Sequence, residues 1–203
     1  MAEKPGIIII EGHPVMRDAL ADFLGGTGRW RITGKASSLA SAKELLTRPG
    51  IKPDIMLLDI RLEDGWGLDI IPWYTKQKSG RVPYMAVYSA FDDYAHVSAA
   101  LSMGVRAYIH KRRNERELES VLLKVLGGGF HIDEIVQARH QLVMDIFNLL
   151  TKREAEILSL VKDGLSNKQI AAALGRSHRT VENIISCIYD KTGIRSRTEL
   201  ERL

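Results

Sequence analysis

The last fifty residues carry a regular set of signals that start and stop short helices. Three S/T-x-x-E/Q pairs can form capping boxes, in which the hydroxyl accepts a backbone N–H and the acid or amide reaches back to the cap residue. These pairs are Thr151 with Glu154, Ser166 with Gln169, and Ser196 with Glu199. Helix ends are expected at Gly164, Gly175 and Gly193, because glycine adopts the left-handed conformation without steric cost. The segment therefore predicts three or four short helices joined by tight turns, the layout of a helix-turn-helix DNA-binding domain.

The longest of these helices has distinct apolar and polar faces. Val181, Ile185 and Ile188 are spaced to face inward. The polar residues between them are placed about one turn apart, as expected of side chains that meet base edges in the major groove. These outward residues are Arg179, Glu182, Asn183 and Ser186. We expect contacts to DNA phosphates around them from Lys168, Arg176, Ser177, His178, Thr180, Lys191, Arg195 and Arg197. The alternative is a small helical bundle whose polar face is merely solvated.

Residues 148–203 also resemble a known family. The stretch GLSNKQIAAALGRSHRTVEN…KTGIRSRTEL looks like the C-terminal DNA-binding domain of LuxR/NarL/FixJ-type regulators. The resemblance implies that Glu182, Asn183 and Ser186 meet bases; Asn suits adenine, and Glu can accept from a cytosine amino group. This segment holds ten Lys or Arg against seven Asp or Glu, a difference of only +3. Non-specific electrostatics alone would not hold it on DNA at physiological salt, so we expect a homodimer on a two-half-site operator.

The whole chain has the composition of an ordinary soluble protein. Its 203 residues suit one or two domains, with 45% hydrophobic and 27% charged residues and a net charge of +4. A single cysteine excludes a disulfide framework and suits a reducing cytoplasm, where we expect the protein to work. We expect no signal peptide, because the initial apolar run is short, and no stretch approaches the roughly twenty apolar residues of a membrane span.

Residues 1–127 alternate between apolar strand patterns and helical stripes. This alternation predicts a doubly wound α/β domain with a five-stranded parallel sheet, of flavodoxin-like architecture, followed by the all-α helix-turn-helix domain. Strands are expected at 7–10, 31–36, 54–58, 84–88 and 106–110, and helices at 15–24, 39–46, 68–74, 96–103 and 115–126. Three glycines at 127–129 then open a linker, 128–147, whose apolar residues recur at helical spacing. This amphipathic helix could pair with a second chain, although we favour packing within its own chain.

Four polar residues follow or end the predicted strands. They are Glu11, Asp59, Ser89 and Lys111, and such folds carry their chemistry at the carboxyl ends of strands. An aspartate near an acidic metal ligand, a hydroxyl and a lysine is an arrangement for phosphoryl transfer to the aspartate. Mg²⁺ and the lysine would neutralise the phosphoryl oxygens while the carboxylate attacks. The alternative is four unrelated polar residues at strand ends, where polar residues are common.

Together these landmarks resemble the receiver domain of two-component response regulators over about residues 5–126. PDIMLLDIRLEDGWGLDII looks like the phosphoacceptor segment and implies that Asp59 is the acceptor. VYSAFDD resembles the Ser/Thr segment through Ser89, and VRAYIHK the segment with the switch aromatic, Tyr108, and the lysine, Lys111. IIIIEGHPVMRDAL resembles the opening strand and helix of the family.

One departure from the family pattern falls in the metal site. Where the family has an acidic pair before His-Pro, this chain has Glu11-Gly12. The resemblance implies Mg²⁺ held by Glu11 and Asp59, weakened because Gly12 lacks the second carboxylate. Water could replace that ligand, since Mg²⁺ keeps waters when protein ligands are few. Glu63 or Asp64 could also approach the metal, although we do not favour this.

These observations predict a DNA-binding transcriptional response regulator of a two-component system, controlled through its receiver by phosphorylation of Asp59. Its partners would be double-stranded DNA, a sensor histidine kinase and RNA polymerase, and we expect no enzyme activity. In the alternative, Gly12 marks an atypical pseudo-receiver that is controlled by dimerisation or a ligand and not by Mg²⁺-dependent phosphorylation. A third hypothesis, a free-standing phosphotransfer or hydrolytic enzyme, ranks last, because no substrate pocket accompanies Asp59 in the sequence.

Overall fold

The computed structural model describes residues 3–77 and 82–201. The chain divides into two compact units, Met1–Gln137 and Ala138–Leu203, and each is described by itself. Within the described residues, no helix combines the length and the hydropathy that a membrane crossing requires.

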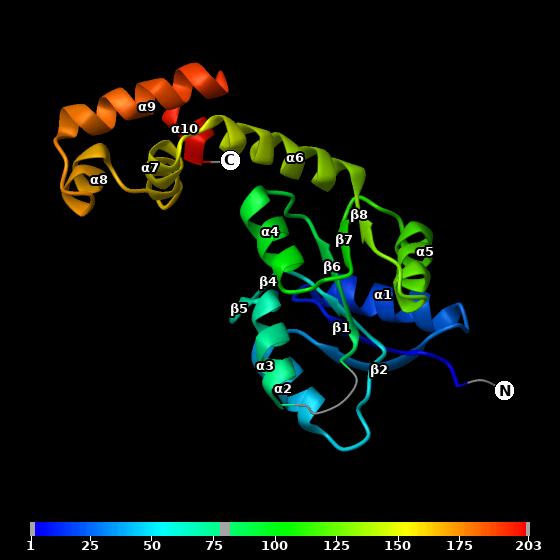
Figure 1. The fold of residues 1–203 in the computed structure, drawn as a ribbon. Helices are drawn as coiled ribbons and strands as arrows, with labels where there is room; N and C mark the ends of the chain where they lie inside the picture. Colours follow the sequence, from blue (N-terminus) through cyan, green and yellow to red (C-terminus); the bar gives the residue numbers. More distant parts are fainter. Residues whose placement is uncertain (1–2, 78–81, 202–203) are drawn as a thin grey trace. The chain divides into compact units, whose positions relative to one another are not determined.

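The first unit is a parallel sheet covered by helices on both faces (Figure 1). Its strand order is β2-β1-β3-β6-β7-β8, and every neighbouring pair is parallel. The strands are β1 Gly6–Ile10, β2 Arg31–Ala36, β3 Ile55–Leu58, β6 Tyr84–Ser89, β7 Ala107–His110 and β8 His131–Ile132. The helices are α1 Pro14–Gly26, α2 Leu39–Thr47, η1 Gly67–Asp69, α3 Ile70–Gln77, α4 Tyr94–Ser102 and α5 Glu115–Leu126. The predicted doubly wound α/β fold is thereby confirmed.

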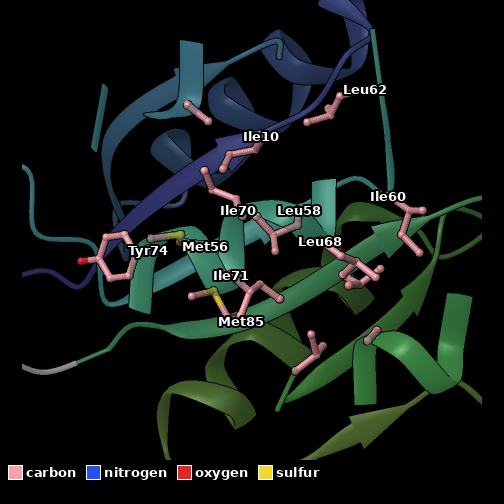
Figure 2. Close-up of a cluster of buried hydrophobic side chains, with 14 of the residues drawn as sticks. Ile10, Met56, Leu58, Ile60, Leu62, Leu68, Ile70, Ile71, Tyr74 and Met85 are labelled. Atoms are coloured by element: carbon pink, nitrogen blue, oxygen red, sulfur yellow. The ribbon is translucent and has the colours of Figure 1, made fainter. Parts of the chain in front are cut away.

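Strand β1 shows why the sequence folds this way. Ile7 and Ile9 belong to the core layer beneath α1 and α5, whereas Ile8 and Ile10 belong to the layer beneath α2, α3 and α4. Figure 2 shows the second layer, with Ile10 near Leu58 and Ile70. All four isoleucines are fully buried, because side chains alternate between two covered faces in a parallel sheet.

The sheet has a sixth strand that the sequence pattern did not predict. β8 is only two residues long and pairs with β7 through His131 N–H to the Arg106 carbonyl, 3.0 Å. A pair of residues is too short to show strand periodicity. The chain also forms a small antiparallel hairpin after Asp59, from β4 Arg61–Leu62 and β5 Gly65–Trp66.

Helix α6, Glu134–Leu149, starts in the first unit and ends in the second. Val136 near its start is fully buried in the core of the first unit, and Phe147 near its end packs against the core of the second unit. Residues 128–137 of the expected linker therefore belong structurally to the first unit. The helix packs within its own chain at both ends, as favoured from the sequence.

In the described part of the second unit, up to residue 201, four further helices surround one core. They are α7 Lys152–Lys162, α8 Asn167–Ala173, α9 His178–Thr192 and α10 Arg197–Glu201. The capping boxes at Thr151 and Ser166 are both formed. The predicted stop glycines have positive φ, 80° at Gly164, 61° at Gly175 and 70° at Gly193, a conformation that costs glycine little.

Candidate functional site: a phosphoacceptor centre and a DNA-binding face

The four predicted polar residues meet at the carboxyl ends of the central strands. Backbone hydrogen bonds extend the strand ladders to them: Asp59 N–H donates to the Ile10 carbonyl at 2.8 Å, and Lys111 N–H to the Ser89 carbonyl at 2.8 Å. Glu11, Asp59 and Ser89 are 2%, 4% and 0% exposed. Strand order thus brings together residues that lie up to one hundred positions apart in the chain.

Lys111 connects the two carboxylates. Its Nζ lies 2.7 Å from Glu11 Oε2 and 2.6 Å from Asp59 Oδ2. The second oxygen of Asp59, Oδ1, accepts a hydrogen bond from Ser89 Oγ at 3.1 Å. Asp59 is therefore held between a cation and a hydroxyl, which are the two groups that would contact a phosphoryl group placed on it.

Tyr108 is linked to this centre through Phe91. Its fully buried hydroxyl donates to the Phe91 carbonyl at 2.8 Å, and Phe91 N–H donates to Ser89 Oγ at 3.4 Å. Burial raises the pKa of Tyr108 far above its usual value, with the carboxylates Asp93, Asp92 and Asp59 adding to the effect. The phenol therefore stays protonated and remains a hydrogen-bond donor.

The position of the missing acid has room for a side chain. A Cβ added at Gly12 would lie 3.6 Å from the Arg61 carbonyl oxygen, an ordinary contact, and the backbone there is not left-handed. Next to it is a cavity of about 300 Å³, lined by Gly12, His13, Pro14, Arg61, Leu62 and Glu63. The residues present offer a divalent cation two buried carboxylates and space for water ligands, so they fit such an ion in a reduced form.

Neither Glu63 nor Asp64 replaces the missing carboxylate by a contact in the structure. Asp64 accepts hydrogen bonds from the backbone N–H groups of Leu39, 2.7 Å, and Ala40, 2.8 Å, at the start of α2. The hydrogen bond from Ala40 is the main reason that the pKa of Asp64 is lowered. Asp64 therefore caps a helix, and Glu63 is exposed at the rim of the cavity.

A positioning residue that the sequence analysis did not identify is Gly67. A Cβ there would lie 1.9 Å from the Asp59 carbonyl oxygen, and Gly67 N–H donates to the Ile60 carbonyl at 2.7 Å. The backbone of Asp59 and that of residue 67 thus lie too close for any side chain between them. The one sequence signal for this close approach is the glycine itself, directly after the β4–β5 hairpin.

A larger cavity opens beside Asp59. It has a volume of about 640 Å³, and its lining combines apolar side chains with the charged groups of the site. The lining residues are His13, Val15, Met16, Ala19, Asp59, Arg61, Ala90, Phe91, Lys111 and Glu115. A phosphodonor could reach Asp59 from this side.

The second unit presents the expected polar face on α9. Val181, Ile185 and Ile188 are buried. Ser177 is the N-cap residue of the helix, and its hydroxyl accepts from Thr180 N–H at 3.1 Å. The predicted base-reading residues Arg179, Glu182, Asn183 and Ser186 are all exposed. So are Lys168, Arg176, His178 and Arg195 among the predicted phosphate contacts. His178 Nδ1 lies 3.3 Å from Glu182 Oε2, so the negative charge of Glu182 has a neighbouring partner.

Two of the predicted phosphate contacts are bound within the domain. Lys191 Nζ lies 2.7 Å from the buried Glu154 carboxylate, which also caps α7. Arg197 donates to Asn167 Oδ1 at 2.8 Å and to the Leu165 carbonyl, joining α10 to the turn before α8. These side chains hold the helices together, and contact with DNA remains a prediction for them.

Known proteins match both parts of the chain. Residues 7–123 match the response regulator receiver domain, and residues 148–203 match the bacterial regulatory proteins of the luxR family. The chain therefore belongs to the response regulators that join a receiver to a LuxR-type DNA-binding domain. It is a DNA-binding transcriptional response regulator of a two-component system, controlled through its receiver domain.

Individual relatives cover nearly the whole chain. The transcriptional activator DevR/DosR of Mycobacterium tuberculosis is 29% identical over 203 residues, 95% of this chain and 90% of the relative. The response regulator VraR of Staphylococcus aureus is 28% identical over 200 residues, 95% and 92% of the two chains. RcsB of Salmonella enterica serovar Typhimurium, in its promoter-bound structure, has a TM-score of 0.73 at 19% identity, covering 98% of this chain and 97% of that chain. The last comparison supports the fold alone.

Proposed function

We propose that Asp59 accepts a phosphoryl group from a sensor histidine kinase. An Asp59 carboxylate oxygen would form a bond to phosphorus while the bond from phosphorus to the kinase imidazole breaks. The observation that carries this proposal is the placement of Lys111 Nζ at 2.6 Å and Ser89 Oγ at 3.1 Å from the two oxygens of Asp59. These groups can move from the carboxylate to the phosphoryl oxygens, while Tyr108 acts as the switch residue through Phe91.

Glu11 and Asp59 would hold the divalent cation, which is Mg²⁺ by the family resemblance. When bound, such an ion neutralises phosphoryl oxygens. Lys111 supplies one positive charge to this site, and Gly12 removes one carboxylate from the family pattern. Each protein molecule would accept one phosphoryl group per signalling cycle and would not turn over a separate substrate, so we propose no independent enzyme activity.

The output would be transcriptional control in the cytoplasm, where the chromosome lies. Asn183, Glu182 and Ser186 on α9 would meet base edges, and the exposed cations around α8 and α9 would contact phosphates. The net charge of only +3 over residues 148–203 favours two copies on DNA. RcsB, whose fold is similar, has been seen as dimers bound to DNA. RNA polymerase would be the partner of the DNA-bound dimer.

Phosphorylation is tested by treating the full chain with acetyl phosphate and divalent cation, then measuring intact mass and oligomeric state. We expect one added phosphoryl group in the wild type and none in Asp59→Asn, with beryllofluoride shifting the oligomeric state without a mass label. Gly12→Asp tests the metal side, because the new carboxylate fits the available space. If the wild type stays unmodified while Gly12→Asp gains the phosphoryl group, native phosphorylation at Asp59 is refuted.

The DNA side needs a pair of variants with different expected effects. Asn183→Ala should relax sequence preference, because it removes a base contact. Lys168→Ala should weaken binding to all sequences and reduce the salt slope by about 1, because it removes a phosphate contact. Unchanged sequence preference in Asn183→Ala would show that the recognition surface lies elsewhere.

A further inference from the structure

His13 lies directly beside the carboxylate that remains from the acidic pair. Its backbone N–H donates to Glu11 Oε1 at 3.0 Å, and its Nδ1 lies 3.3 Å from the same oxygen. His13 is the N-cap residue of α1, and Pro14 follows it as the first helical residue. The helix start therefore fixes the His13 backbone at this point, while the imidazole ring stays 81% exposed.

The imidazole completes a group of three possible metal ligands. One ligand atom from each of Glu11, His13 and Asp59 lies within 4.8 Å of the others. At metal–ligand distances of about 2.0–2.2 Å, two neighbouring ligands of one ion lie about 2.8–3.1 Å apart in octahedral geometry and about 3.3–3.6 Å apart in tetrahedral geometry. The 3.3 Å between His13 Nδ1 and Glu11 Oε1 is compatible with that spacing.

Gly12 decides which donors an ion can reach. No carboxylate extends from position 12, and the 300 Å³ cavity there is lined by His13 and Gly12 together. Asp64 is engaged at the start of α2 and contributes nothing to the group. The neighbouring 640 Å³ cavity is lined by both His13 and Asp59, so a cation beside the Glu11 and Asp59 carboxylates would find the His13 imidazole as its third donor.

We propose that Glu11, His13 and Asp59 bind a divalent transition-metal ion such as Mn²⁺ or Zn²⁺ in preference to Mg²⁺, with the His13 imidazole as the nitrogen ligand. The proposal takes the phosphoacceptor site proposed above as its setting and specifies the ion of that site. Imidazole suits transition metals, whereas Mg²⁺ prefers oxygen ligands throughout its shell. Replacing a carboxylate by an imidazole therefore weakens Mg²⁺ binding more than it weakens binding of Mn²⁺ or Zn²⁺.

The existing contacts allow this coordination. Lys111 contacts Glu11 Oε2 and Asp59 Oδ2, so an ion would bind the other two oxygens, Glu11 Oε1 and Asp59 Oδ1. Each of these already accepts one hydrogen bond, from His13 N–H and from Ser89 Oγ, and keeps a second lone pair for an ion. An imidazole with its proton on Nε2 offers a lone pair on Nδ1, which is the nitrogen of His13 that faces Glu11. The backbone N–H of His13 keeps its hydrogen bond to Glu11 when the ring turns from hydrogen bonding to metal binding.

The test is Mn²⁺ binding to the untagged full chain, followed by electron paramagnetic resonance of free Mn²⁺, with Mg²⁺ as the competitor. We expect the wild type to bind one Mn²⁺ at this site and to release it only at a large excess of Mg²⁺. His13→Phe should lower Mn²⁺ affinity on the order of tenfold or more, the range for disturbed metal sites, and leave Mg²⁺ affinity unchanged. Gly12→Asp should raise the affinity for Mg²⁺ and so reduce the preference of the site for Mn²⁺ over Mg²⁺.

His178→Ala is the matched control, because His178 and Glu182 form a second exposed pair at the same 3.3 Å separation but in the other unit. It should leave the Mn²⁺ isotherm of the receiver site unchanged. Equal Mn²⁺ affinity in His13→Phe and wild type, or no Mn²⁺ bound by the wild type, would overturn the proposal. Intact mass after acetyl phosphate treatment, measured on the same samples, distinguishes the two proposals. If Asp59 is phosphorylated but His13→Phe has the same Mn²⁺ binding isotherm as the wild type, only the metal assignment is refuted.

Discussion

Replacing Lys111 with methionine is expected to destabilise the receiver domain far more than the loss of an ordinary lysine ion pair. Glu11 Oε2 and Asp59 Oδ2 contact the same Nζ at 2.7 and 2.6 Å, so these two oxygens lie at most about 5 Å apart. Without the ammonium group, two unit negative charges at about 5 Å repel by about 3 kcal/mol at an effective dielectric constant of about 20. That is a large part of a typical domain stability of about 5–15 kcal/mol.

The assay is urea unfolding of the full chain in EDTA, followed by tryptophan fluorescence. All three tryptophans, Trp30, Trp66 and Trp73, lie in the first unit, so the signal reports the receiver alone. Lys35→Met is the matched control, because Lys35 Nζ also lies 2.6 Å from a carboxylate, Asp18, but both side chains are about half exposed. This exposed pair should contribute little to stability, because water and salt screen its charges.

Two results would decide the matter. A loss of about 3 kcal/mol in Lys111→Met that is partly restored by a divalent cation supports the charge balance inferred for the site. A loss no larger than that of Lys35→Met would refute it, because the two buried carboxylates would then tolerate each other without the lysine.

Three further substitutions test other contacts. Gly67→Ala should destabilise the receiver by about 1–3 kcal/mol, measured by urea unfolding, and should impair phosphorylation, measured by intact mass. Gly26→Ala is the control: its new Cβ would meet no atom of another part of the fold within 4 Å, so it should change neither quantity. The pKa of Glu154 is lowered from 4.5 to about 2, first by the hydrogen bond from Lys191, so its carboxylate stabilises the fold above about pH 4.5 and loses this effect as pH falls toward 2. Lys191→Met should therefore shift the acid loss of helicity, followed by circular dichroism, to higher pH; an unchanged midpoint would contradict the pairing. Arg197→Ala should destabilise the second unit by about 2 kcal/mol, seen as an earlier circular dichroism transition, and an unchanged transition with weaker DNA binding would make it a DNA contact instead.

The sequence predicted the fold wherever a local signal matched the final environment. The run Ile7–Ile10 indicated a strand buried on both faces, and the caps at Thr151 and Ser166 indicated helix starts that the structure confirms. The sequence did not predict β8, because the position of this strand in the sheet depends on contacts of one residue that follows it, Asp133. Asp133 accepts a hydrogen bond from His110 N–H at 2.8 Å and forms an ion pair with Arg113 at 3.1 Å. Neither contact produces a periodic pattern of apolar residues in the sequence.

The site was predictable in its members but less so in its contacts. Strand-end positions placed Asp59, Ser89 and Lys111 together, because parallel strands present their carboxyl ends on one edge. The sequence could not show that Lys191 is bound to Glu154, since that pair depends on how α9 packs against α7. Nor could it show that Gly67 adjoins the Asp59 backbone, which follows from the path of the β4–β5 hairpin.

The contacts of Asp133 also bear on how a structural change around Asp59 is transmitted beyond the receiver domain. Asp133 N–H donates to the carbonyl of Tyr108 at 3.0 Å, and its carboxylate accepts from the N–H of His110, the residue before Lys111. Its own carbonyl accepts from Gln137 N–H in the first turn of α6, and Val136 shares the buried cluster of Tyr108. Strand β7, which positions both Tyr108 and Lys111, therefore cannot shift against β8 without straining the start of α6. Because α6 is the covalent connection to the second unit, we expect a displacement of Tyr108 to be passed on through the start of this helix.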